Sequence, residues 1–154
     1  MEDRQAWEWI LTFSNLFDSL GDLDWLAVIV AAIAVFALAW VWYTPLFGKA
    51  WSAATGKEMS GNPDPETLAK AGAVFILFSV GVAYFVTSLH HMFQNPASFE
   101  TLVVSSLVLA LFIVGSTMLS RVVWEGSSTT LWAIDFGFWF LAAVIAAEVQ
   151  DLMA

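Results

Sequence analysis

Four long, nearly uncharged stretches constrain the fold of this chain more than any other feature. About 20 apolar residues in a helix cross the roughly 30 Å hydrocarbon core of a bilayer. In lipid every backbone polar group needs an internal hydrogen bond, and these stretches lack the period-two alternation of barrel strands. The sequence therefore predicts an all-α, polytopic membrane protein, an antiparallel bundle of four transmembrane helices. The stretches are residues 25–43, 71–89, 101–120 and 131–147.

The composition excludes an ordinary soluble domain. Of 154 residues, 60% are apolar and 12% charged, against about 45–50% and about 25% in soluble domains. A chain this short cannot enclose four wholly apolar helices behind its few polar residues. We therefore expect one transmembrane domain, residues 23–154, preceded by an extension, residues 1–22. Pro45 is expected to end the first helix, and residues 44–68 read as a polar, turn-rich loop.

Charge and residue usage exclude several classes of function. The 14 acidic and 5 basic residues leave a net charge of −9, which repels the phosphates of nucleic acids. The absence of cysteine removes thiol nucleophiles, disulfides and cysteine-ligated metals. No phosphate-binding glycine loop, HExxH motif or nucleophile elbow occurs. The sequence predicts a protein that is not an enzyme.

The distribution of basic residues predicts the orientation. Cytoplasmic connections accumulate Lys and Arg. With four crossings, only Arg4 falls on the side of the termini, so both termini are expected on the non-cytoplasmic side. The basic residues on the opposite side are Lys49, Lys57, Lys70 and Arg121.

The extension carries an amphipathic segment at residues 6–20. Its broad apolar face is typical of a helix that lies in the headgroup region. The segment lacks basic residues, so anionic lipid attracts it weakly and a protein partner is favoured. The expected docking residues are Trp7, Trp9, Phe13 and Phe17.

An aromatic run closes the first apolar stretch, from Trp42-Tyr43-Thr44-Pro45 to Trp51. Here the chain resembles a family of small bacterial four-helix membrane proteins of unknown function, with the signature W-Y-[ST]-P-x-x-F-G-x-x-W. Leu23-Asp24-Trp25 and Trp124-Glu125-Gly126 are similar to other parts of that family, and the resemblance covers residues 23 to about 150. We interpret the run as a membrane-interface motif formed by Trp42, Tyr43, Pro45, Phe47, Gly48 and Trp51.

The resemblance implies a fold and a place in the bacterial inner membrane, but no activity. The chain departs from the family pattern in two respects. Residues 1–22 are additional, and Asp135 stands where an uncharged polar residue, Asn, is expected. An additional arm on a shared bundle favours a protein that docks onto a partner.

Asp135 is the polar group of greatest interest inside the predicted spans. A carboxylate within a membrane is costly and indicates a relay, an ion path or a partner. Because it lies one turn inside the fourth span, a structural contact is favoured, and water, Arg121 or a backbone donor could satisfy it. The alternative is a small oligomeric transporter or channel. Its path would be lined by Asp135 and hydroxyls of the third helix, among them Ser105, Ser116 and Thr117.

Two adjacent histidines, His90 and His91, follow the second span. Imidazole can ligate haem iron or a chlorophyll-type pigment. However, neighbouring histidines on a helix point in different directions, and the chain has no further membrane histidine for a bis-histidyl haem. An interfacial pair without a cofactor is therefore favoured, with a pigment- or haem-binding subunit of a photosynthetic or respiratory complex as a further alternative.

The leading hypothesis is a non-catalytic accessory subunit. It would contact the lipid bilayer and pack against a larger membrane complex or a second copy, and it would require no metal, cofactor or nucleic acid.

Overall fold

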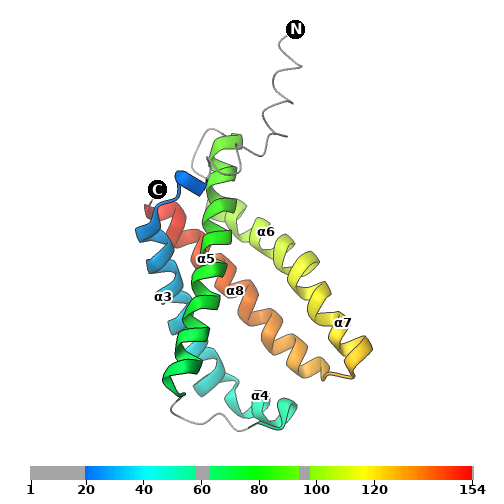
Figure 1. Cartoon of the computed structure of the whole chain (residues 1–154). Helices are drawn as coiled ribbons and strands as arrows, with labels where there is room; N and C mark the ends of the chain where they lie inside the picture. Colours follow the sequence, from blue (N-terminus) through cyan, green and yellow to red (C-terminus); the bar gives the residue numbers. More distant parts are fainter. Residues whose placement is uncertain (1–19, 58–62, 94–97, 154) are drawn as a thin grey trace.

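The computed structural model describes residues 20–57, 63–93 and 98–153. These residues form helices and connections and include no strand, which confirms the predicted all-α class (Figure 1). Four helical segments are long and apolar enough to cross a membrane, as predicted. The predicted interfacial helix of the extension lies outside the described residues.

The first span begins at a capped helix start. Helix α3, Trp25–Val41, follows Asp24, whose carboxylate accepts hydrogen bonds from the amides of Leu26 at 2.8 Å and Ala27 at 3.2 Å. Such a cap satisfies amides that have no partner within the helix.

The end of the first span differs from the expectation that Pro45 would stop the helix. The helix continues as a π-helical turn, Trp42–Leu46, with Pro45 inside it. The amide of Phe47 donates to the carbonyl oxygen of Trp42, five residues back, at 2.9 Å. Proline lacks an amide hydrogen, and the wider turn accommodates it without ending the helix at that residue.

Part of the predicted loop 44–68 is also helical. Helix α4, Gly48–Thr55, follows the π turn directly and ends at Gly56, which has a φ of 68°. This left-handed conformation carries no steric penalty for glycine. The sequence did not predict α4, because hydropathy identifies segments of membrane length and eight residues are too few to cross a bilayer.

The other three spans extend beyond their apolar centres at both ends, because polar residues continue the helices. The third span is interrupted by a second π turn, Ala110–Gly115. The helices are α5, Pro65–Phe93; α6, Phe99–Leu109; α7, Ser116–Glu125; and α8, Thr129–Met153.

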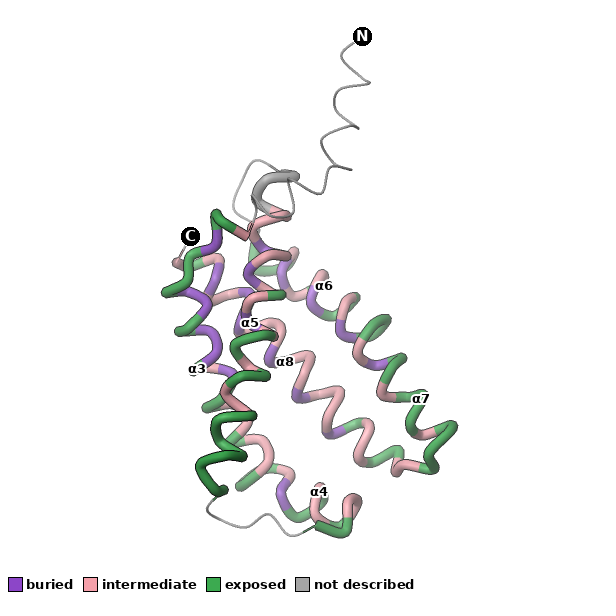
Figure 2. The backbone as a smooth tube through the Cα atoms, viewed as in Figure 1, coloured by how far each residue is buried: buried purple, intermediate pink, exposed green. Residues whose placement is uncertain are grey.

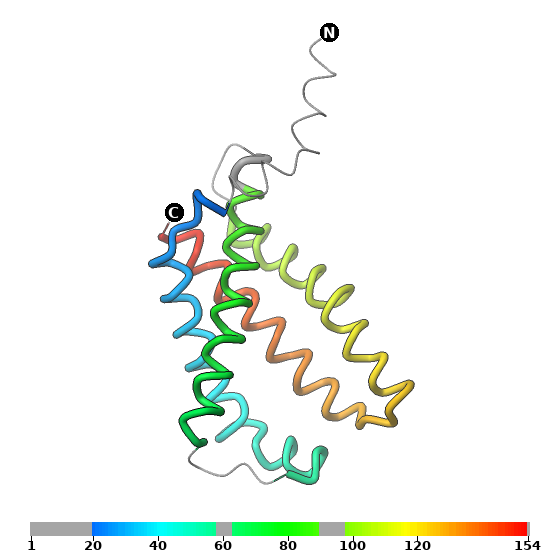
Figure 3. The backbone as a smooth tube through the Cα atoms, in the orientation of Figure 1, coloured from blue at the N-terminus to red at the C-terminus, as the bar shows by residue number. Residues whose placement is uncertain are grey.

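Helix α8 is the centre of the bundle, and α3, α5 and the α6–α7 span all pack against it (Figures 1 and 3). Consecutive spans run in opposite directions, so the start of α3 and the end of α8 lie at the same end. Figure 2 shows the buried residues on the facing sides of α3 and α8. Small residues let these helices approach closely. The main core cluster consists of Ala31, Val35, Phe138, Ala142 and Ala146.

Candidate functional site

The end of the first span is tied to the start of the fourth by two hydrogen bonds. The phenolic oxygen of Tyr43 donates to Oδ1 of Asp135 at 2.9 Å. One residue earlier on each helix, Nε1 of Trp42 donates to the carbonyl oxygen of Ile134 at 3.1 Å. The side chains of Tyr43 and Asp135 are half-buried. The single carboxylate of the fourth apolar stretch therefore has a donor within the chain.

A glycine on α8 makes room for the indole of Trp42. A Cβ atom added at Gly137 would lie 3.1 Å from Cζ2 of Trp42. The ring of Tyr43 packs beside Phe138, with ring centroids 5.1 Å apart. Both aromatic side chains of the Trp42-Tyr43 pair thus turn inward onto α8.

Helix α4 closes over the same two residues. The ring of Phe47 lies 4.5 Å from that of Trp42, and the ring of Trp51 lies 6.2 Å from that of Tyr43. A Cβ atom at Gly48 would lie only 2.7 Å from the backbone oxygen of Tyr43. Only glycine permits this close approach of two backbone segments.

These residues form one cluster, which we call the junction: Trp42, Tyr43, Phe47, Gly48 and Trp51, together with Asp135 on α8. The structure therefore brings most of the predicted membrane-interface motif into contact with the predicted intramembrane carboxylate. The depth of the motif in the bilayer stays a prediction.

Sequence reasoning proposed Arg121 or a backbone donor for Asp135 and missed Tyr43. The guanidinium of Arg121 forms an ion pair with Glu125, with 3.1 Å between Nε and Oε2, and its charge also acts on Asp135 without a direct bond. Arg121 and Asp135 do line a common cavity between α7 and α8, of about 10 Å³, which is about the smallest volume that can hold one water molecule. A signal for Tyr43 was present in the sequence. The first span ends and the fourth begins at the same membrane face, so Tyr43 and Asp135 share a depth.

The hydroxyls of the third span are not gathered around Asp135. Ser116, Thr117 and Ser120 are exposed, and each donates to a carbonyl oxygen three or four residues earlier in the same span. Ser105 is half-buried. The structure therefore brings Tyr43 and Asp135 together, and the third-span hydroxyls do not join this pair.

A second indole contact also escaped sequence reasoning. Nε1 of Trp132 donates to the carbonyl oxygen of Gly115 at 3.0 Å, which joins α8 to the second π turn. The π turn frees carbonyl oxygens from the regular α-helical pattern. An isolated tryptophan at a span boundary gives no sequence signal for such a partner.

Several predicted residues cannot be placed in the site. His90 and His91 belong to the last turn of α5, and their side chains lie outside the described part of the chain, as do Trp7, Trp9, Phe13 and Phe17. Among the described residues, no group of three or more His, Cys, Asp or Glu side chains is arranged to hold a metal ion.

A family match covers the junction and nearly all of the four spans. The model described as "Protein of unknown function (DUF1761)" matches residues 26–150. The chain belongs to this family. No curated protein and no solved structure matches the chain. In this DUF1761 protein the match begins after the extension, so residues 1–22 lie outside it.

Proposed function

We propose that this DUF1761 protein is a non-catalytic subunit of the bacterial inner membrane that packs against a larger membrane complex or a second copy. The observation that carries the proposal is an outward face of α7 made of small, hydroxyl-bearing residues. Ser116, Thr117 and Ser120 are exposed on this face. We call these three residues the α7 face.

The α7 face suits contact with another helix. Its hydroxyls already donate to carbonyl oxygens of the same span, in the second π turn or in α7, so they need no polar partner from outside. Small residues four apart, such as Ser116 and Ser120, let a second backbone approach closely, which is how helices associate in lipid. Large exposed apolar side chains, including Phe112, Leu119 and Val123, flank the face and add contact area.

The interior polar groups favour a structural role over transport. Asp135 accepts a hydrogen bond from Tyr43 and thereby connects two helices. A transport path would need this carboxylate and the third-span hydroxyls along one route, and the exposed α7 face does not adjoin the Tyr43–Asp135 pair. We accordingly assign Asp135 to helix packing, and the histidines to the membrane boundary without a cofactor.

The test is the assembly state of the full chain, extracted from its own membranes in mild detergent and measured by native mass spectrometry. We expect a complex with a partner subunit or a dimer. Ser116→Leu/Ser120→Leu should release a monomer, because the larger side chains separate the helices.

The matched control places leucine at two other exposed small residues, Ala37 on α3 and Ala73 on α5. Ala37→Leu/Ala73→Leu should keep the assembly. A wild-type monomer, or equal loss in both double variants, contradicts a docking role for the α7 face.

A further inference from the structure

An apolar groove of about 370 Å³ lies between α5, the second π turn with the end of α6, and α8. The α6–α7 span packs on α8 and leans away from α5 (Figure 1). Small residues keep the groove open. Gly81 and Ala143 line it, and a Cβ atom added at Gly81 would meet nothing within 4 Å.

The groove lies at the middle of the spans. The midpoint of each of the three spans lies two positions from a residue that lines the groove. Gly81 is two positions from residue 79, the midpoint of 65–93. Ala110 and Ala143 lie equally close to residues 112 and 141, the midpoints of 99–125 and 129–153. This depth corresponds to the hydrocarbon centre of a bilayer, so an opening here faces acyl chains.

The chemistry of the lining matches hydrocarbon. The lining contains no charged side chain, and its only hydroxyl belongs to Ser106, which is buried. A polar or charged ligand would lose its hydration without gaining partners. Large apolar side chains, among them Phe85, Ile113 and Trp139, line the rest of the wall.

The size of the groove selects between apolar occupants. Its volume falls within the range of small-ligand sites, about 300–1,000 Å³. A helix with its side chains is about 10 Å in diameter and would need a far wider channel. One extended hydrocarbon chain fits the space, whereas a complete helix of a second copy does not.

We propose that this groove binds one acyl chain of a bilayer phospholipid. The π turn places Ala110 and Ile113 in the groove wall, and single-turn π-helical segments inside helices are frequent at functional sites. The bound chain fills the space that the α6–α7 span leaves open. The site is separate from the α7 face and does not depend on the function proposed above.

The test uses the full chain in vesicles of phosphatidylcholine that carry a photoreactive diazirine at the middle of one acyl chain. Cross-linked residues are mapped by mass spectrometry. We expect labelling at groove residues such as Phe85 and Ile113 to exceed labelling at Ile29 and Ile33, which are exposed on α3. After dilution into unlabelled lipid, the groove label should decay more slowly, because a bound chain exchanges more slowly than bulk lipid.

Gly81→Leu should fill the groove and reduce the labelling of its residues to the level of Ile29 and Ile33 on α3. Gly72→Leu is the matched control, since Gly72 lies on the same helix with the same open space but does not line the groove. The proposal would be overturned if, in the wild-type protein, the groove residues were labelled and exchanged their label to the same extent as Ile29 and Ile33. This measurement needs no variant. A Gly81→Leu protein that folds and keeps its groove label would also overturn it. If Gly81→Leu instead changed a dimer into a monomer, the groove would be assigned to a second copy of the chain, and the proposal would again fail.

Discussion

Tyr43 and Asp135 are separated by 92 positions in sequence, yet they share a hydrogen bond of 2.9 Å. A carboxylate inside a span is tolerated where a donor and nearby water reduce the cost of removing it from bulk solvent. The phenol of Tyr43 is that donor here. This pair places the carboxylate of Asp135 in a contact between the first and fourth spans.

Removing the phenolic hydroxyl tests this role. Tyr43→Phe should destabilise the protein by about 1–2 kcal/mol, because it leaves a half-buried carboxylate without its donor. The measurement is thermal unfolding in detergent, with a double-mutant cycle through Asp135→Asn to isolate the coupling between the two side chains.

The matched control is Tyr84→Phe, which changes the only other tyrosine of the chain. Tyr84 packs against a different cluster, around Leu23, Val28 and Ala83. If the two Tyr→Phe variants lose the same stability and the cycle shows no coupling, the Tyr43–Asp135 bond contributes nothing measurable.

At Gly48 the nearby backbone of Tyr43 leaves no room for a side chain. Gly48→Ala places a methyl group 2.7 Å from the backbone oxygen of Tyr43, so the turn into α4 must shift. We expect a loss of about 1–3 kcal/mol, the usual cost of overpacking. Unfolding of Gly72→Ala is the comparison, because Gly72 has open space and alanine favours a helix. Equal stability of the two variants would show that α4 moves freely away from Tyr43.

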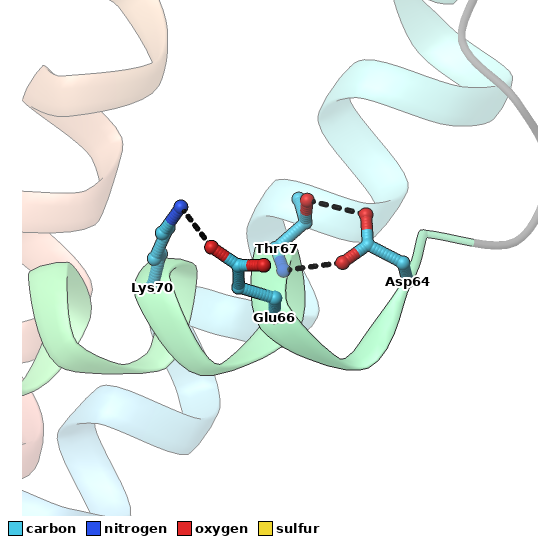
Figure 4. A network of polar contacts seen from close by, with 4 residues as sticks. All are labelled: Asp64, Glu66, Thr67 and Lys70. Atoms are coloured by element: carbon cyan, nitrogen blue, oxygen red, sulfur yellow. Dashed lines mark hydrogen bonds and ion pairs between the residues drawn. The ribbon is translucent and has the colours of Figure 1, made fainter.

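At the scale of elements, the start of α5 combines several local signals. Asp64 precedes Pro65, and its two carboxylate oxygens accept from the hydroxyl of Thr67 at 2.7 Å and from the amide of Thr67 at 3.0 Å (Figure 4). One turn on, Lys70 and Glu66 form an exposed ion pair with 2.6 Å between Nζ and Oε1. Exposed pairs of this kind contribute little, so the cap is the more important signal.

The cap predicts a pH dependence for the α5 start. The hydroxyl and then the amide of Thr67 lower the pKa of Asp64 below its ordinary value, which is about 3.9 for aspartate. The ionised cap therefore stabilises the folded state above that pH, and the stabilisation disappears as the pH falls through the lowered folded pKa. The protection factors of the first α5 amides, which compare each exchange rate with the intrinsic rate at the same pH, should fall on acidification.

Asp64→Asn is the matched control for this titration. Asparagine is an equally good cap but does not titrate, so the acid-induced loss of protection should be absent. A loss of protection of equal size in the Asn variant would place the titrating group elsewhere.

The four membrane-length elements could be predicted from hydropathy alone, because a wholly apolar segment of 20 residues has few stable alternatives to a spanning helix. Their ends could not. Pro45 lies inside a π turn and α4 occupies part of an expected loop. In both places contacts stabilise a backbone that local propensity disfavours: Trp42 and Tyr43 bond α8, and α4 packs against α8.

At the scale of the whole molecule, the arrangement makes topology measurable. The chain contains no cysteine, so single cysteines can report sidedness without a prior substitution. Gly21→Cys and Leu152→Cys should react with a membrane-impermeant maleimide from outside intact cells. Ser127→Cys, in the α7–α8 connection, should react only after permeabilisation, because the basic residues favour a cytoplasmic position for that end.

Gly21 and Leu152 should in any case behave alike, since four crossings return the chain to its starting side. Labelling of only one of them from outside would contradict four crossings. Labelling of Ser127→Cys alone would invert the orientation and leave the fold unchanged.

The sequence by itself determined the solvent of this protein, its helical class and its four spans, because these depend on the length and apolarity of continuous segments. It also singled out both sides of the junction, Trp42-Tyr43 with Gly48 and Asp135, but as separate features. Only the tertiary structure decided that they meet, that the α7 hydroxyls face outward and that a groove remains beside α8. These outcomes depend on helix rotation and on contacts between residues distant in sequence, and a pattern of apolar residues that is nearly uniform around each helix specifies neither.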